Sequence, residues 1–269
     1  MSVSAPTRLT PIGRMTPFRA QRIWERNLLV YKRLWKILFS GFFEPVFYLF
    51  SIGVGIGALV GDLTLPGGQT VSYTAFVAPA LMATSAMNGS VMETTFNIFF
   101  KLRFDHVYEG ILTTPVQVKD IAIGEIGWAL FRGSLYSSVF LAVMAMMDLT
   151  NTWWSLLTIP GSVLIGFAFG SVGLACCTYM RSWQDFDLVM LATMPLFLFS
   201  ATFYPLDVYP PVLQAVTRLS PLYHGNELLR SFSLGIFDWS IAGHIAYLLV
   251  MGLIGAAVAS RRLDGLLRK

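Results

Sequence analysis

Long apolar runs fill this chain from about residue 40 onward, and they constrain its fold more than any other feature. Six runs approach the roughly 20 residues that a helix needs to cross a bilayer. They cover residues 41–60, 73–100, 121–147, 154–179, 186–203 and 241–260. Because 55% of the 269 residues are hydrophobic and only 13% are charged, we expect an all-α integral membrane protein with six transmembrane helices.

The basic residues are distributed unevenly between the two sides that these spans define. Eight precede the first span, three lie between spans two and three, one lies between spans four and five, and four follow span six. The opposite side would hold only Arg218 and Arg230. Since lysine and arginine mark cytoplasmic loops, we expect a multi-pass protein of the cell membrane with both termini in the cytoplasm. The same bias accounts for the net charge of +4, so no nucleic-acid partner is expected.

The chain is expected to have four parts: a cytoplasmic tail at 1–16, an amphipathic helix at 17–39, a transmembrane domain at 40–262 and a second cytoplasmic tail at 263–269. The amphipathic helix would place aromatic and leucine residues on one face and cations on the other, a pattern typical of helices that lie in the membrane interface. The apolar face would carry Trp24, Leu28, Tyr31, Trp35 and Leu38. A soluble helix packed on another protein is the alternative.

Glycines recur at intervals of four in two of the spans. Gly53, Gly57 and Gly61 form two GxxxG spacings in the first span, and Gly166 and Gly170 form one in the fourth. Small residues at this spacing let helix backbones approach closely. We expect them to pack helices together, within one subunit or between two.

The loop between spans two and three has the pattern of a short amphipathic helix. Asp105 can cap a helix whose apolar residues fall on one side, and Asp120 can cap the next span. The apolar residues are Val107, Tyr108, Ile111 and Leu112. Such a helix, held out from two long spans, would suit docking of a cytoplasmic partner. A loop that only packs on itself is the alternative.

Three ionisable residues lie within the spans, where each is costly unless it is paired or solvated. Glu125 and Arg132 are seven residues apart in span three and so share a face, and Glu93 of span two would come level with them in an antiparallel hairpin. We expect one buried Glu–Arg–Glu cluster. It would act as a neutralising lock between the helices or as a relay for protons or substrate.

Motifs of soluble catalysis are missing from the sequence. It has no P-loop, HExxH, GxSxG or CxxC pattern, and His106, His224 and His244 are far apart along the chain. We therefore expect no catalytic residues, no metal site and no cofactor bound by this chain. Energy for uphill transport would come from a partner or an ion gradient.

The segment 204–230, between the last two spans, is too long and too apolar for a simple loop. Its prolines divide it into short pieces, one of which, at 212–219, has apolar residues at helical spacing. We expect it to lie on the external side, on the membrane or dipping into it.

Several of these motifs, in this order, resemble the permeases of type-2 ABC exporters, most closely the branch that exports nodulation factors (lipo-chitooligosaccharides). The similarity covers nearly the whole chain, from Trp24 to Arg262. It is carried by three groups of residues. The first is Tyr48-Leu49-Phe50 with Gly53, Gly55 and Gly57, followed by Val71-Ser72-Tyr73-Thr74-Ala75-Phe76 and Ala83-Thr84-Ser85-Ala86-Met87. The others are Leu112-Thr113-Thr114-Pro115 with Asp120-Ile121 and Gly124-Glu125, and Phe203-Tyr204-Pro205-Leu206 with Pro210-Pro211, Leu219-Ser220-Pro221-Leu222 and Arg230.

The resemblance implies an interfacial helix, six spans, a coupling helix at 105–114 and re-entrant external helices that form an exit gate. The gate residues would be Tyr204, Pro205, Pro210, Pro211 and Pro221. Residues that would dock an ATPase are Asp105, Val107, Tyr108, Glu109, Ile111, Leu112, Thr113 and Thr114. It also implies a second permease subunit in a homodimer, and a separate nucleotide-binding subunit that holds ATP and Mg²⁺. The substrate would be an amphiphile such as a lipid, lipo-oligosaccharide, glycolipid or drug, met among membrane lipids. The alternatives are a secondary transporter or channel, and a membrane enzyme acting on lipids with Glu93, Glu125 or His224 as acid–base residues.

Overall fold

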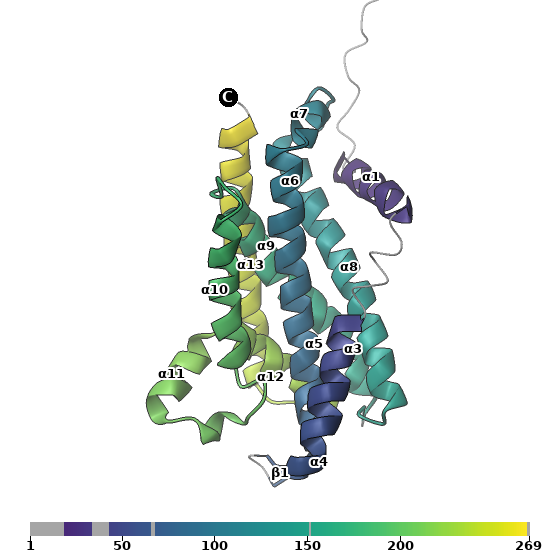
Figure 1. Ribbon diagram of the computed structural model, residues 1–269, viewed down its shortest axis with the longest axis vertical. Coiled ribbons are helices and arrows are strands. Elements are labelled where there is room, and N and C mark those ends of the chain that lie inside the picture. Colours follow the sequence, from purple (N-terminus) through teal and green to yellow (C-terminus); the bar gives the residue numbers. More distant parts are fainter. Residues whose placement is uncertain (1–18, 34–42, 66–67, 151, 268–269) are drawn as a thin grey trace, which may run out of the picture.

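The computed structural model describes residues 19–33, 43–65, 68–150 and 152–267 (Figure 1). In this part of the chain long helices run side by side along one axis. Short helix α7 lies near the C-terminus at one end of the bundle, and α11 and strand β1 lie at the other (Figure 1). We refer to these as the α7 end and the α11 end.

The helices of the first half begin with α1 (Arg19–Arg33), followed by α3 (Phe43–Tyr48), the π-helix η1 (Leu49–Ile56) and α4 (Gly57–Val60). Strands β1 (Asp62–Thr64) and β2 (Thr70–Ser72) form a small antiparallel hairpin. A continuous helical run then contains α5 (Tyr73–Met92), the π-turn η2 (Glu93–Asn97) and α6 (Ile98–Arg103). Next come α7 (Val107–Leu112) and α8 (Val118–Met146).

The second half contains the 3₁₀ turn η3 (Trp153–Leu157), α9 (Thr158–Cys177) and α10 (Asp185–Leu198). The segment before the last helix folds into η4 (Leu206–Val208), α11 (Pro211–Leu219) and α12 (Pro221–Leu234). Helix α13 (Ser240–Leu267) completes the described chain. It continues beyond the boundary expected at residue 262, so most of the expected tail at 263–269 extends this helix.

Four of the six expected spans form helices that are long and apolar enough to cross a membrane: Tyr73–Arg103, Val118–Met146, Trp153–Cys177 and Ser240–Leu267. The fifth, α10, has 14 residues. The first continues from α3 to α4 and borders residues 34–42, which lie outside the described part. These four helices make the protein a helical, multi-pass membrane protein. The count of six spans stays a prediction.

Helix α9 lies at the centre of the bundle and contacts α5, α8, α12 and α13. Its glycines make these contacts possible, as expected: a Cβ atom at Gly166 would lie 2.8 Å from the Ser90 hydroxyl oxygen, and one at Gly170 would lie 3.5 Å from Ser90 Cβ. Buried apolar side chains form one cluster toward the α11 end and a second toward the α7 end.

The glycines of the first span have two different roles. Gly53 and Gly57 lie against Thr74 of α5, because added Cβ atoms would approach its side chain to 2.8 and 2.7 Å. The Thr74 hydroxyl also donates to the Gly53 carbonyl at 2.6 Å. Gly61 instead follows α4 with a φ of 73° and has open space around its Cβ position, so it is a turn residue within this chain. Packing between subunits stays a prediction for all three.

The segment 204–230 forms two successive helices, and its prolines set their boundaries as expected. Pro211 occupies the first turn of α11, and Ser220 separates α11 from α12, which begins at Pro221. Arg230 of α12 is buried and donates to the carbonyl oxygens of Ala201 at 2.9 Å and Phe76 at 3.3 Å. Its guanidinium also lies 3.8 Å from the centre of the Phe76 ring, so α12 is fastened to α5.

Candidate functional site: a short helix linked to two buried ion pairs

Helix α7 protrudes at one end of the bundle, between α6 and α8 (Figure 1). His106 precedes it in a left-handed conformation with a φ of 48°, and its ring nitrogen Nδ1 lies 2.9 Å from Glu109 Oε1. The expected cap at Asp105 is therefore wrong, because His106 occupies the N-cap position and no side chain caps this helix. At the next span Gln117 occupies the N-cap position, and Asp120 contributes to the cap from three residues further on, where it accepts the Gln117 backbone N–H at 2.9 Å as part of a capping box.

The two faces of α7 differ as the sequence predicts. Tyr108 is buried in the core at the α7 end, and Ile111 and Leu112 pack against that core. The polar side and the adjoining turns face outward. The exposed residues are Phe104, Asp105, His106, Glu109, Gly110, Thr113, Thr114 and Pro115. The helix thus presents a mixed polar surface outside and has an apolar anchor inside.

The first ion pair joins this anchor to α6, α8 and α1. Lys101 and Glu125 are buried, and Lys101 Nζ lies 2.9 Å from Glu125 Oε2. The same carboxylate accepts from the Tyr108 hydroxyl at 3.0 Å and from Asn27 Nδ2 at 3.1 Å. Burial, reinforced by the Glu125 charge, raises the pKa of Tyr108 well above its usual value, so the phenol remains a donor.

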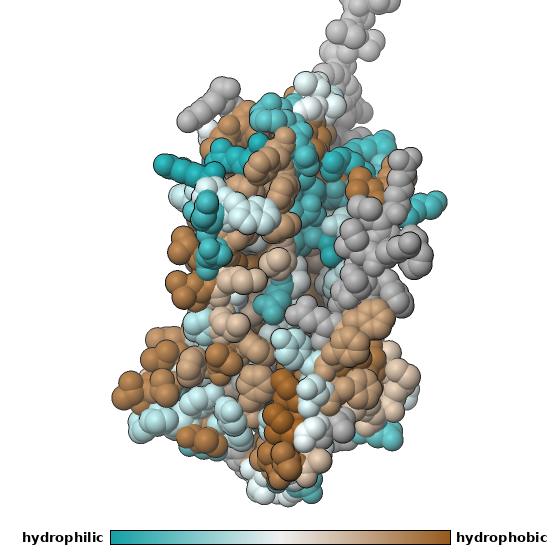
Figure 2. Space-filling model, in the orientation of Figure 1, coloured by the Kyte–Doolittle hydropathy of each residue, from teal (hydrophilic) through white to brown (hydrophobic). Residues whose placement is uncertain are grey.

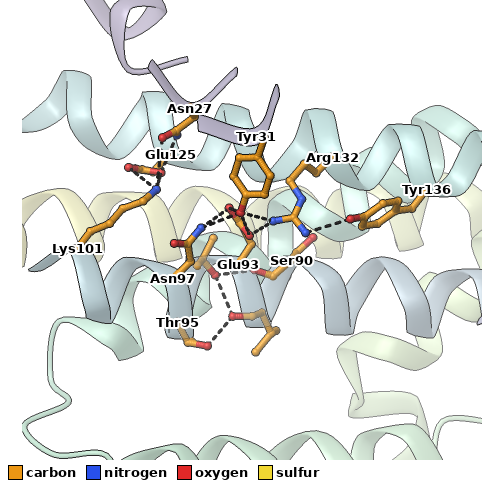
Figure 3. Close-up of polar contacts among 12 residues, drawn as sticks. Asn27, Tyr31, Ser90, Glu93, Thr95, Asn97, Lys101, Glu125, Arg132 and Tyr136 are labelled. Carbon is orange, nitrogen blue, oxygen red and sulfur yellow. Dashed lines mark hydrogen bonds and ion pairs between the residues drawn. The ribbon is translucent and has the colours of Figure 1, made fainter. Parts of the chain in front are cut away.

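The second ion pair joins Glu93 of η2 to Arg132 of α8 (Figure 3). Tyr31 of α1 accepts from Arg132 Nη1 at 2.7 Å and donates to Glu93 Oε1 at 3.3 Å. Asn97 donates to the same Glu93 oxygen at 2.8 Å, and Arg132 Nη2 donates to the Tyr136 hydroxyl at 3.0 Å. A π-turn places Glu93 in this network, a form of helix often found at functional positions.

The single Glu–Arg–Glu cluster expected from the sequence is therefore wrong. Glu93 and Lys101 lie eight residues apart on one helical run, and Glu125 and Arg132 lie seven apart on α8, which runs antiparallel to it. On each helix the acid precedes the base along the chain, and because the helices are antiparallel each acid lies level with the base of the other helix. Two separate pairs therefore form, Glu93 with Arg132 and Lys101 with Glu125. Lys101 is one of the three basic residues expected between spans two and three, and its spacing of eight residues from Glu93 is the sequence signal that places both on one helical face.

Helix α1 bridges both pairs, a contact that its sequence pattern does not predict. Asn27 and Tyr31, one turn apart, reach the first and second pair respectively (Figure 3). Ile23 packs beside Gly124 of α8, where a Cβ atom would lie 2.6 Å from Ile23 Cβ.

Of the apolar stripe expected on this helix, Trp24 and Tyr31 contact Trp128, with ring centres 5.8 and 5.2 Å apart. Leu28 is exposed together with Leu29 and Val30. Trp35 and Leu38 lie outside the described residues. The role of α1 in the membrane interface stays a prediction.

The expected gate lies at the α11 end, far along the bundle from α7 (Figure 1). Tyr204 is 53% exposed, and Val212, Val216 and Leu219 make the outer side of α11 apolar and exposed. His224 and His244, 20 residues apart in the chain, meet here with their Nδ1 atoms 2.7 Å apart. Within the described residues, no group of three or more His, Cys, Asp or Glu side chains converges on a metal position.

Comparison with known proteins agrees with this architecture. A family model described as "ABC-2 type transporter" matches residues 19–234, from α1 to the end of α12. The chain belongs to the ABC-2 type transporter family. Nodulation protein J of Rhizobium leguminosarum bv. trifolii is 32% identical over 248 residues, which cover 90% of this chain and 92% of the relative.

Two further ABC-2 relatives extend the range of similarity. Nodulation protein J of Rhizobium meliloti (strain 1021) is 32% identical over 90% of this chain and 92% of its own length. The Inner membrane transport permease YadH of Escherichia coli (strain K12) is 25% identical over 80% of this chain and 83% of its own length. The resemblance to type-2 ABC permeases is thus confirmed, and the chain is a permease component of an ABC transporter.

Proposed function

We propose that this chain is the permease subunit of an ATP-driven exporter that moves an amphiphilic substrate out of the cytoplasm or the inner leaflet. A separate subunit binds ATP and Mg²⁺ and docks at α7. Two copies of the chain form the transport unit in the cell membrane, with both termini and the α7 end in the cytoplasm. Helix α11 gates the exit at the opposite side.

The observation that carries this proposal is the connection from α7 to the long helices. Tyr108 is 1% exposed and bonds to Glu125, which is paired with Lys101 and also accepts from Asn27. A force on α7 therefore acts on α1, α6 and α8 together. A partner bound to the exposed tip could move three helices as one body, as a transporter driven by an external ATPase requires.

The surface of the molecule supports the proposed orientation. Hydrophilic residues gather around the α7 end, whereas apolar residues dominate the remainder of the face in view (Figure 2). Exposed leucine, isoleucine, valine, methionine and phenylalanine side chains on α8, α10 and α13 suit contact with lipid or with a second subunit. The relatives named Nodulation protein J and the transport permease of E. coli favour transport over lipid-modifying chemistry.

The docking role of α7 can be tested by reversing charge on its exposed side. The complex with a candidate nucleotide-binding subunit is reconstituted in nanodiscs, and ATP hydrolysis is measured with and without membrane amphiphiles. Glu109→Lys is expected to abolish co-purification or ATPase stimulation, because Glu109 is exposed at the tip and bonded only to His106 among the described residues. Asp62→Lys is the matched control, since Asp62 is exposed at the α11 end.

Each result separates a specific alternative. If no nucleotide-binding subunit co-purifies with the wild-type chain, and the chain alone carries gradient-driven flux, the ATP-driven mechanism is wrong. If Glu109→Lys behaves like Asp62→Lys, α7 is not the docking site. The gate is tested separately: a cross-link between the two copies within 212–219 should stop release while leaving ATP binding intact.

A further inference from the structure

Helix α5 is the most enclosed long helix of the described chain, yet one face of it is open at mid-length. All 20 of its residues are buried except Thr74, Ser85, Asn88, Gly89 and Met92. The last four follow the spacing i, i+3, i+4 and i+7, so they form one stripe. Three of the four are polar or lack a side chain, which is unusual for a surface in contact with hydrocarbon.

Asn88 lies at the centre of this stripe and at the middle of the membrane-length helix. It is 15 residues from Tyr73 and 15 from Arg103, the ends of the 31-residue apolar run. At 1.5 Å per residue it stands about 22 Å from either end. Its side chain is exposed and makes no hydrogen bond to any described residue. An unpaired amide facing lipid tails at this depth is strongly disfavoured, so Asn88 must face another polar group.

The surroundings of the stripe show where that group would lie. In Figure 1, α3 and α10 stand on either side of α5 on the near face. Aromatic contacts close this face above and below the stripe: Phe186 of α10 lies 5.2 Å from Phe96, and Phe197 of α10 lies 6.3 Å from Tyr48 of α3. Between them the stripe is open. Figure 2 shows a small hydrophilic spot over α5, surrounded by neutral and apolar residues.

A small crevice, lined by both apolar and polar residues, continues from this stripe toward α8. It has a volume of about 10 Å³, close to that of one water position, and lies beside Ser85 and Gly89. Arg132, Tyr136 and Ser137 line its other side. The Nε–H of Arg132 is buried and has no acceptor among the described residues, so the crevice holds an unused donor. The charge of Arg132 itself is balanced by Glu93.

We propose that Ser85 and Asn88 bind the uncharged, hydroxyl- or amide-bearing head group of the transported amphiphile, with one of its hydroxyl groups in the crevice beside Arg132. This inference rests on the proposed function and adds the residues that would select the head group. An amide and a hydroxyl both donate and accept hydrogen bonds, which matches sugar-like groups, and the balanced Glu93–Arg132 pair supplies no net charge to attract an ion. The apolar chain of the substrate would lie against the exposed Met190, Leu191 and Met194 of α10.

Head-group selection can be measured with dodecyl maltoside and dodecanol, two probes that share an alkyl chain. The first assay uses the ATPase complex in nanodiscs and compares, for the two probes, the concentration that gives half-maximal stimulation of ATP hydrolysis. The second assay measures binding of a fluorescent alkyl maltoside to the permease without the ATPase. The wild type is expected to prefer the maltoside, and Asn88→Leu should reduce this preference by about tenfold, as loss of one or two hydrogen bonds implies. Asn88→Gln should restore part of it. Ser138→Ala, a hydroxyl removed from α8 away from the crevice, should leave it unchanged.

Two outcomes would overturn the inference. One is an unchanged preference in Asn88→Leu. The other is a disulfide that forms readily between two copies of the Asn88→Cys variant, made in a Cys176→Ser background, whether or not the maltoside is present. That result would place residue 88 against the second subunit. If the ATPase cannot be found but Asn88 still governs maltoside binding, only the proposed energy source fails. If ATP hydrolysis is coupled normally and Asn88→Leu is silent, only this head-group site fails.

Discussion

Replacing Lys101 by methionine tests whether the Lys101–Glu125 pair holds α7 in place. The two charged atoms are 2.9 Å apart, and their side chains are 9% and 2% exposed. At an effective dielectric constant of about 20, Coulomb's law gives an attraction of about 6 kcal/mol at this distance. Methionine preserves the length of the side chain but leaves the Glu125 carboxylate with only Asn27 and Tyr108. Breaking a buried pair from one side typically costs about 3–5 kcal/mol.

A double-mutant cycle separates this electrostatic effect from lost packing. Glu125→Gln in the Lys101→Met background removes the uncompensated charge and keeps an oxygen for Asn27 and Tyr108. The double variant is expected to recover more than half of the stability lost in Lys101→Met, so the coupling energy should be about 2 kcal/mol or more. Thermal unfolding of the detergent-purified protein is the assay. A loss of 3–5 kcal/mol corresponds to a fall in Tm of about 6–20 °C for a domain of this size.

The function of the pair is read in the same variants. Lys101→Met should weaken ATPase coupling more than membrane insertion, because the pair connects α7 with α1, α6 and α8. The reasoning is refuted if Lys101→Met unfolds within about 1 kcal/mol of the wild type, or if the two substitutions have additive costs. Either result would mean that the carboxylate is adequately solvated or held by its hydrogen bonds alone.

Three further predictions concern the neighbouring structure. Arg132→Leu leaves the Glu93 carboxylate buried without its cation and should lower stability by about 3–5 kcal/mol in thermal unfolding; normal folding and transport would exclude a locking role. Gly124→Ala should loosen α1 and cost about 1–3 kcal/mol, seen as faster proteolysis near residue 33, whereas Gly127→Ala, with open space at its Cβ, should be silent. Hydrogen bonds from the backbone N–H groups of residues 181 and 182 lower the pKa of Asp185, which lies just before the fifth expected span. The stabilisation from the ionised carboxylate is therefore complete above the usual pKa of 3.8 and is lost as pH falls through the lower pKa of the folded state. Asp185→Asn should abolish this part of the acid dependence when the unfolding temperature is measured over a pH series.

Elements governed by local chemistry were predictable from the sequence. The apolar runs gave the four long helices, because hydrocarbon requires every backbone group to bond within its own segment. Pro211 and Pro221 set where α11 and α12 begin, since proline lacks the N–H that a helix interior needs. The apolar side of α7 around Tyr108 was also visible, because helical periodicity alone selects a buried face.

Partners across helices were not predictable in the same way. The sequence named Glu93, Glu125 and Arg132 but gave no means to decide which acid meets which base, because that depends on the axial offset of α5–α6 against α8. Glycines of α9 let it pack closely against both α5 and α8. In the packed bundle the axial offset between α5–α6 and α8 brings Lys101 to Glu125 and Arg132 to Glu93.

The sequence by itself determined that this protein is a helical membrane permease with a short amphipathic helix between its second and third spans. The tertiary structure decided what that helix is attached to. Asn27 and Tyr31 of α1 reach both ion pairs because Gly124 lets α1 approach α8, a contact between residues about a hundred positions apart. Only the packed fold also revealed Asn88 as an exposed amide, without a hydrogen bond to any described residue, in the middle of a mostly buried helix, since exposure depends on which neighbours cover each face.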